Sequence, residues 1–135
     1  MEMLEEAKAH MPEVVYRRAK HIITENARTL TASHALKSGD IETVSTAMAQ
    51  SHVSMRDDFE ITVRPIDYLV EIIDEVLGKS GGVRMTGGGF GGCVVALAPT
   101  DKVDAVKQVV ADKYFDETGY HADIYVCTAT QGAFA

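Results

Sequence analysis

Apolar residues recur at helical spacing along the first half of the chain, and this spacing predicts amphipathic helices. The first predicted helix spans residues 13–36 and the second spans residues 41–59. Pro12 fits the start of the first helix, Gly39 fits its end, and Asp40 can cap the second. The apolar face of the first helix comprises Val15, Ala19, Ile22, Ala27 and Leu30. The apolar face of the second comprises Ile41, Val44, Met48, His52, Met55 and Phe59.

A third helix is predicted over residues 64–77. It begins at Arg64-Pro65, because proline is favoured in a first helical turn, and Gly78 ends it. Its buried stripe comprises Ile66, Leu69, Val70, Ile73 and Leu77. The short segment 60–63, between the second and third helices, is β-prone.

The second half of the chain combines strands with one helix. Residues 83–86 predict a short strand, and the apolar run CVVALA at 93–98 predicts a buried one. The intervening loop can join antiparallel neighbours as a hairpin. A helix is predicted over residues 101–117, with Gly119 after its end, and a final strand over 122–128. The buried face of that helix comprises Val103, Val106, Val110 and Tyr114. This order predicts a single α+β domain over residues 1–135, with a small antiparallel sheet packed with helices.

Composition narrows the function classes. Of 135 residues, 46% are hydrophobic and 24% charged, which is typical of a globular domain. The net charge of −7 and the lack of a dense basic run argue against nucleic-acid binding. No apolar stretch reaches the roughly 20 residues that span a bilayer, and the N-terminal residues lack the pattern of a signal peptide. We therefore expect a cytoplasmic protein that does not bind membranes.

Several polar residues invite a chemical interpretation, but each also has a structural one. Arg56, Asp57 and Asp58 could form a metal or acid–base group. Adjacent carboxylates on a helix point to different faces, so we favour a network that orders the turn into residues 60–62. Arg84, just before the glycine-rich loop, could face a phosphate or form a structural ion pair, and we favour the ion pair.

The two cysteines and five histidines show no spacing typical of metal ligands, so we predict no metal site in this chain. Cys93 and Cys127 lie on predicted strands, where we expect buried, inert thiols. His52 lies on the apolar face of the second predicted helix. We expect it to be a core or interface residue with its polar atoms satisfied.

The most informative feature is a loop with five glycines in six residues, at positions 87–92. Glycine permits positive φ angles and close approach of the backbone to a ligand, and exposed N–H groups can form an anion-binding nest. The spacing matches G-x-G-x-x-G, but a dinucleotide fingerprint opens a helix, and this loop opens onto a predicted strand. A tight structural hairpin therefore remains as an alternative to a ligand loop. We expect Phe90 to anchor the loop by packing its ring.

The flanks of this loop favour a ligand role through a resemblance. The segment GGVRMTGGGFGGCVVAL is similar to the third signature motif of the GHMP kinases, in its galactokinase form. Three further segments resemble galactokinases in the expected order: residues 21–29 (HIITENART), 51–62 (SHVSMRDDFEIT) and 125–133 (YVCTATQGA). The chain thus resembles the C-terminal domain of a galactokinase. This resemblance implies a ferredoxin-like domain with added N-terminal helices.

The resemblance also implies a function for the whole enzyme. Galactokinases transfer the γ-phosphoryl group of ATP to the anomeric hydroxyl of galactose with Mg²⁺, and the third motif lies at the cleft between their two domains. By analogy, the loop approaches the nucleotide phosphates or the transferring group. The residues implied to bind the cofactor are Thr86, Gly87, Gly88, Gly89, Phe90, Gly91 and Gly92.

The family's other motifs do not occur in this chain. The sugar-binding motif, the phosphate loop and the catalytic aspartate belong to the N-terminal domain, so no catalytic residue can be assigned here. We expect the chain alone to be inactive, to bind ATP and Mg²⁺ weakly, and to require the missing N-terminal kinase domain as its partner. It could also self-associate through its exposed domain interface. Gly89→Val should impair the full-length enzyme more than it unfolds it. The alternative is a stand-alone module that senses a metabolite or binds a partner.

Overall fold

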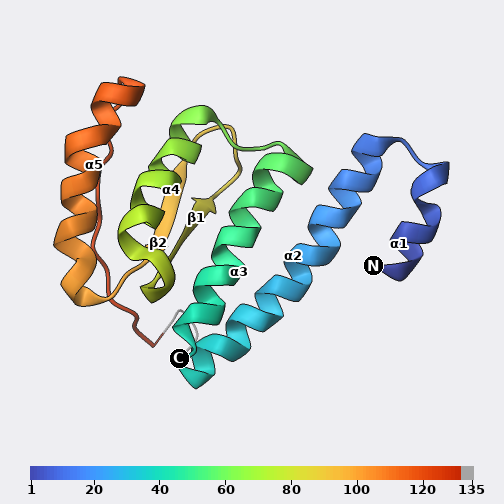
Figure 1. Ribbon diagram of the computed structural model, residues 1–135, viewed down its shortest axis with the longest axis horizontal. Coiled ribbons are helices and arrows are strands. Elements are labelled where there is room, and N and C mark those ends of the chain that lie inside the picture. Colours follow the sequence, from blue (N-terminus) through green and yellow to red (C-terminus); the bar gives the residue numbers. More distant parts are fainter. Residues whose placement is uncertain (132–135) are drawn as a thin grey trace.

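The helices of this chain lie side by side, and a two-stranded sheet lies among them. The computed structural model describes residues 1–131. Figure 1 shows α1 and α2 at one end of the row, then α3 and the sheet, and α5 at the other end. The helices and strands are α1 (Glu2–Ala7), α2 (Glu13–Ser38), α3 (Ile41–Ser54), α4 (Arg64–Leu77), β1 (Gly82–Thr86), β2 (Cys93–Leu97) and α5 (Val103–Thr118). The short helix α1 was not expected from the sequence.

Strands β1 and β2 form the expected antiparallel hairpin. Their register runs from Gly82 opposite Leu97 to Thr86 opposite Cys93. Because side chains alternate along a strand, Val83 and Met85 share one face of β1, and both are almost completely buried there. Helices α4 and α5 cover that face, and α3 contacts β1. The prediction of a small antiparallel sheet packed with helices is confirmed.

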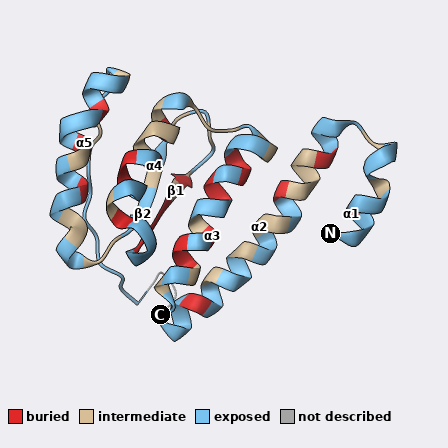
Figure 2. Cartoon of the chain, viewed as in Figure 1, coloured by how far each residue is buried: buried red, intermediate tan, exposed pale blue. Residues whose placement is uncertain are grey.

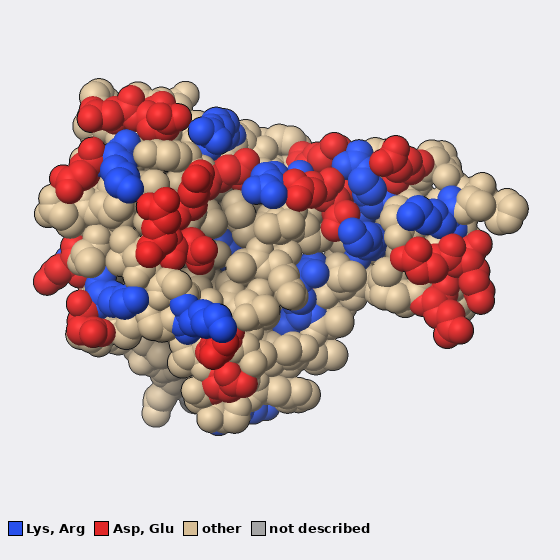
Figure 3. Space-filling model, in the orientation of Figure 1, with Lys and Arg blue, Asp and Glu red and all other residues tan. Residues whose placement is uncertain are grey.

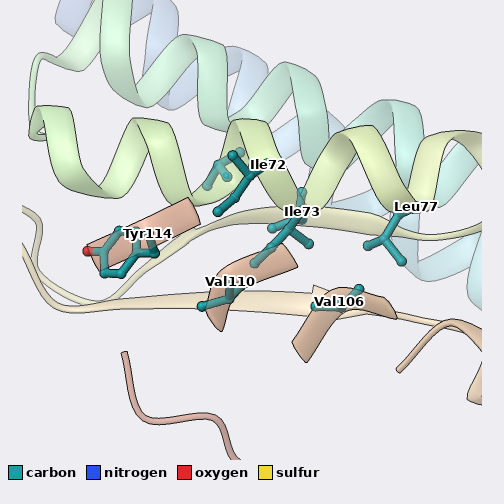
Figure 4. Packing of buried hydrophobic residues seen from close by; sticks show 8 residues of the cluster. Ile72, Ile73, Leu77, Val106, Val110 and Tyr114 are labelled. Atoms are coloured by element: carbon teal, nitrogen blue, oxygen red, sulfur yellow. The ribbon is translucent and has the colours of Figure 1, made fainter. Parts of the chain in front are cut away.

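The main hydrophobic core lies between α4, α5 and the covered face of the sheet. Figure 4 shows side chains of α4 lying across from those of α5. The apolar stripes expected on these two helices supply most of it, so the sequence periodicity is confirmed here. The cluster comprises Val70, Ile72, Ile73, Leu77, Val83, Val106, Val110 and Tyr114. The most deeply buried side chains include Leu77, at 1% exposure, and Ile72, at 2%.

Two of the expected helix boundaries are confirmed by their capping geometry. Gly39 adopts φ 73°, in the left-handed region that an α-helix commonly uses at its C-terminus. Asp40 then caps α3, because its Oδ1 accepts a hydrogen bond from the Thr43 N–H at 3.0 Å. These adjacent signals turn the chain sharply, and α2 and α3 pack side by side.

The apolar face predicted for α2 is exposed in the structure. Val15, Ile22 and Leu30, on the predicted apolar face, are 48%, 51% and 64% exposed, although such a face usually packs against the core. Figure 2 shows that only isolated positions of α2 are buried. Tyr16 and His21 are among those positions, and His21 stacks on Phe59 with ring centroids 4.5 Å apart. Helix α2 therefore packs through polar and aromatic side chains, and its aliphatic face has no partner among the described residues.

Two predicted β segments do not form strands in the described part of the chain. Residues 60–63 are irregular, because Glu60 adopts φ 57° and the Ile61 carbonyl accepts a hydrogen bond from the loop amide of Phe90. Residues 122–128 are extended but unpaired, since the sheet comprises only β1 and β2. The second predicted helix also changes character, because a π-helical turn at Met55–Phe59 follows α3.

Strand β2 is more exposed than expected. Val95 and Leu97 are 45% and 38% exposed, because α3 and α2 reach the outer face of the sheet only at Gly82 and Arg84 of β1 and leave β2 uncovered there. Cys93 lies on β2, Cys127 lies in the unpaired segment, and both are free and exposed. The prediction of buried thiols was therefore wrong. The end of the motif 125–133, at residues 132 and 133, lies outside the described residues.

Leu77→Ala tests how much the hydrophobic core contributes to the free energy of unfolding. Removing this buried side chain from α4 should lower the free energy of unfolding by about 2–5 kcal/mol, since it loses apolar burial and leaves a cavity. Leu30→Ala is the matched control, because the same truncation on exposed α2 should change that free energy by no more than about 0.5 kcal/mol. Urea unfolding followed by circular dichroism measures both. Equal effects would show that α4 does not form the core.

Candidate functional site

The candidate site is the loop that joins β1 to β2, and its backbone has an unusual conformation. Gly87, Gly89, Gly91 and Gly92 all adopt positive φ angles between 85° and 127°. Phe90 also has a positive φ, at 59°, which is uncommon for a residue with a side chain. Glycine makes such a run of left-handed residues possible in a six-residue connection. The residues predicted to bind the cofactor, 86–92, thus comprise the last residue of β1 and the single loop that follows it.

One side of this loop rests on the segment that precedes α4. The Phe90 N–H donates a hydrogen bond to the Ile61 carbonyl at 2.7 Å. A Cβ added to Gly89 would lie 2.8 Å from the Ile61 carbonyl oxygen and 2.8 Å from its Cβ, so this position requires glycine. The Phe90 side chain is 74% exposed. The expectation that its ring anchors the loop was wrong, because the backbone amide makes the anchor instead.

The remaining loop amides are available to a ligand. Among the described residues, Phe90 is the only member of the loop whose N–H has an intramolecular acceptor. The N–H groups of the five glycines therefore face solvent or a bound group. Convergent backbone amides bind anions without a charged side chain, and phosphate oxygens are suitable acceptors. The loop can hold or orient an anion, but it supplies no side chain for acid–base chemistry.

A buried histidine lies beneath the start of the loop. His52 is 5% exposed, and its Nδ1 accepts a hydrogen bond from the Met85 N–H at 3.3 Å. Its Nε2 lies 3.2 Å from Oδ1 of Asp67, on α4. Burial lowers the pKa of His52, and the nearby Asp67 carboxylate partly opposes this shift. His52 is a core residue as predicted, but only its Nδ1 is satisfied, because its Nε2 has no hydrogen-bond partner among the described residues. Sequence reasoning did not identify Asp67 as its neighbour.

Arg84 forms the structural ion pair that we favoured. Its Nη1 lies 3.2 Å from Glu25 Oε1 and donates a hydrogen bond to Ser51 Oγ at 2.7 Å. These contacts connect β1 to α2 and α3. Burial would raise the pKa of Glu25, but hydrogen bonds from Ser51 and Arg28 hold it below its usual value. Arg84 is therefore already paired on the helical side of the loop.

The acidic segment after α3 is also structural. Arg56 pairs with Asp57 at 2.7 Å, whereas Asp58 pairs with Lys20 at 2.9 Å. Next to them, hydrogen bonds from Arg17 and Arg18 lower the pKa of Glu60 to about 2. Within residues 1–131, no group of three or more His, Cys, Asp or Glu side chains could hold a metal ion. These residues form structural pairs, as we favoured, but the contacts to the turn at Glu60 come from Arg17 and Arg18 and not from Arg56.

The surface charge around these networks is mixed. On the face of the described residues in Figure 3, Lys and Arg lie among Asp and Glu, and no extended basic area is visible there. In the same part of the chain, no helix is long and apolar enough to cross a membrane.

The two buried histidines predict how stability depends on pH. Burial lowers the pKa of both His21 and His52 from the ordinary value of 6.5. Below that pH the unfolded chain binds protons more readily than the folded one, so stability is full above pH 6.5 and falls as the pH drops towards the folded pKa values. Urea unfolding between roughly pH 7.5 and pH 5 should show this loss. A chain with both histidines replaced by asparagine should show a flatter profile, and an unchanged slope would contradict the assignment.

Two neighbouring glycines in the loop should differ in their tolerance of a side chain. Gly89→Ala should cost roughly 1–3 kcal/mol, because the added Cβ meets Ile61 and the φ of 85° is strained for alanine. Gly88→Ala should change stability by no more than about 0.5 kcal/mol, because its Cβ meets nothing within 4 Å. Thermal unfolding of the two variants makes the comparison. Equal losses would show that Ile61 does not support the loop.

Comparison with known proteins identifies a family whose members match the segment that contains this loop. The sequence model of the family described as GHMP kinases C terminal matches residues 32–116, which include α3, the hairpin and most of α5. The galactokinase of Pasteurella multocida strain Pm70 is 60% identical over 121 residues, which are 90% of this chain and 31% of that protein. The galactokinase of Haemophilus influenzae strain PittEE is 61% identical over 116 residues, 86% of this chain and 30% of that protein.

A solved structure supports the same relationship. The crystal structure of Lactococcus lactis galactokinase in complex with galactose superposes with a TM-score of 0.80 at 36% sequence identity. The match covers 90% of this chain and 32% of that one. The chain therefore spans about a third of the length of the relatives it matches. The confirmed hairpin, the glycine loop and the family match agree: this chain belongs to the GHMP kinase family and corresponds to the C-terminal domain of galactokinases.

Proposed function

We propose that this chain acts as the C-terminal part of a galactokinase-like enzyme that transfers the γ-phosphoryl group of ATP to the anomeric hydroxyl of galactose. The observation that carries the proposal is the glycine loop, which presents unpaired backbone amides and occurs in a chain about 60% identical to galactokinases. In this proposal residues 86–92 approach the phosphates of the nucleotide. The enzyme works in the cytoplasm, where its two exposed thiols stay reduced.

The described residues fit one part of the ATP site. Backbone amides suit phosphate oxygens, and a rigid loop orients them without reorganising during the reaction. Bound ATP would supply the transferred phosphoryl group. In this proposal the ligands for Mg²⁺ come from the rest of the enzyme and from the phosphates of ATP. The acid–base group comes from the rest of the enzyme as well, so the role of this chain is to position.

Exposed apolar residues support the proposal that a further domain covers this one. Val95 and Leu97 on the outer face of the sheet are exposed, as are Ile22 and Leu30 on α2. Apolar side chains grouped on one face of an element usually contact another part of the protein. The outer face of β2 begins at Cys93, directly after the loop, so a domain docked there would also border the candidate site.

Joining the chain to a galactokinase remainder tests the proposed function. We expect no ATP-dependent phosphorylation of galactose by the 135-residue chain alone. A chimera should be active in which this chain replaces the matching 31% of the Pasteurella multocida galactokinase. Coupled measurement of ADP release with galactose gives the rate. A folded but inactive chimera would contradict the proposal and favour the stand-alone sensing module.

Gly88→Ala in the active chimera tests the loop itself. Gly89→Val is unsuitable, since its effect on folding would mask any effect on the reaction. The methyl group at position 88 extends into open space where we place the phosphates, so kcat/KM should fall roughly 10- to 100-fold at unchanged stability. Ala105→Val is the control, because it adds bulk at an exposed position of α5, outside the hairpin. Unchanged kinetics for Gly88→Ala would remove the loop from the mechanism.

A further inference from the structure

The glycine loop is held at two points by elements that are distant in sequence. Just before it, the Met85 N–H donates to His52 Nδ1 at 3.3 Å, so a side chain of α3 occupies a position where a neighbouring strand would accept. In its middle, the Phe90 N–H donates to the Ile61 carbonyl at 2.7 Å. Met85 is completely buried, whereas the loop beyond it is largely exposed. These two hydrogen bonds therefore fix where the exposed amides point.

Both anchors lead to the same carboxylate. Asp67 Oδ1 lies 3.2 Å from His52 Nε2, and Asp67 Oδ2 accepts a hydrogen bond from Thr62 Oγ1 at 3.2 Å. Thr62 directly follows Ile61, which accepts the bond from Phe90. A continuous path of contacts thus runs from Met85 through His52, Asp67 and the Ile61-Thr62 segment to Phe90. It closes a ring around the base of the loop.

The protonation state of His52 follows from this geometry. Nδ1 accepts a hydrogen bond from a backbone N–H, so in the neutral ring the proton resides on Nε2, facing Asp67. Within residues 1–131, Nε2 and Asp67 Oδ1 are both buried and neither has a hydrogen-bond partner, so the 3.2 Å contact between them is the polar contact that each one makes. Each therefore depends on the other, because an isolated buried polar atom costs about 1–3 kcal/mol.

We propose that His52 and Asp67 are positioning residues that hold both anchors of the glycine loop, and that a proton added to His52 releases the Met85 anchor. A second ring proton would reside on Nδ1, where a donor would then face the Met85 N–H donor. The Nε2 side would stay attracted to Asp67, so the Met85 anchor would be lost. The Phe90 anchor would persist and would respond only through the changed charge at Asp67 and its hydrogen bond from Thr62. The consequence for phosphoryl transfer rests on the proposed function, but the coupling between these residues does not.

The charged groups around His52 set when this release occurs. Burial disfavours its protonated form most strongly, and Asp67 of α4 favours it. Arg56 of the π-helical turn and Arg84 of β1 both disfavour it. Together they lower the pKa of His52 below its ordinary value, so the anchor is intact at neutral pH and is lost on acidification.

Nitrogen-15 NMR of the 135-residue chain without nucleotide tests the proposal between about pH 8 and pH 5. The ring couplings of His52 should identify the Nε2–H tautomer at high pH. The amide resonances of Met85 and Phe90 should then shift with the midpoint of the His52 ring. The rings of His21 and His52 give separate signals. Comparing the midpoint of the amide shifts with the midpoint of each ring therefore shows, within one sample, which histidine causes the shifts. An Nδ1–H tautomer, or amides that follow His21, would overturn the proposal.

Three variants separate the two halves of the path. In His52→Asn, whose amide oxygen can still accept from Met85, the titration of both amides should disappear. In Thr62→Val, which removes the hydroxyl that donates to Asp67, Phe90 should stop following His52 while Met85 still follows it. His21→Asn is the buried control and should leave both shifts unchanged. A Phe90 response that persists in Thr62→Val would refute the path through Asp67. This result would stand even if the chimera were active, because the chimera tests the proposed function and not the coupling.

Discussion

The rest of the structure depends on the hydrogen bonds of strand β1. One edge of this strand faces another strand, whereas the other edge faces a helix. On one side β2 pairs with it in antiparallel register. On the other side there is no strand, and side chains of α3 take that place: His52 accepts the Met85 N–H, and Ser51 accepts from Arg84. A buried backbone donor without a partner would be costly, so α3 must lie where it does. The position of α3 in turn sets that of α2.

The glycine loop inherits its geometry from this arrangement. Its start is fixed by the buried end of β1, and its middle by the Ile61 carbonyl. Gly89 is required because no side chain fits against Ile61, whereas the neighbouring Gly88 borders open space. The loop thus has a supported side and an open side. Among the described residues, the N–H groups of its five glycines have no intramolecular acceptor, and in our proposal they are the groups that meet the phosphates.

The uncovered outer face of β2 belongs to a chain that is only part of the length of its relatives. The chain spans about 31% of the length of the Pasteurella multocida galactokinase that it matches. An apolar sheet face and an apolar helix face, exposed here at Val95 and Ile22, are surfaces that a larger protein can bury. In our proposal the loop forms one wall of an active site, and the catalytic groups lie on the other wall.

The sequence by itself determined the elements whose signals are local. Helical periodicity placed α4 and α5, Gly39 and Asp40 placed the turn between α2 and α3, and the glycine-rich connection placed the hairpin. Its motifs also indicated the family. The sequence misled where burial depends on distant partners: the aliphatic face of α2 is exposed, the apolar strand β2 is half uncovered, and residues 122–128 form no strand. Only the tertiary structure showed that Ile61 accepts a hydrogen bond from the loop and that Asp67 lies beside His52. Periodicity reports which side chains could be buried together, but the packing of whole elements decides which of them are.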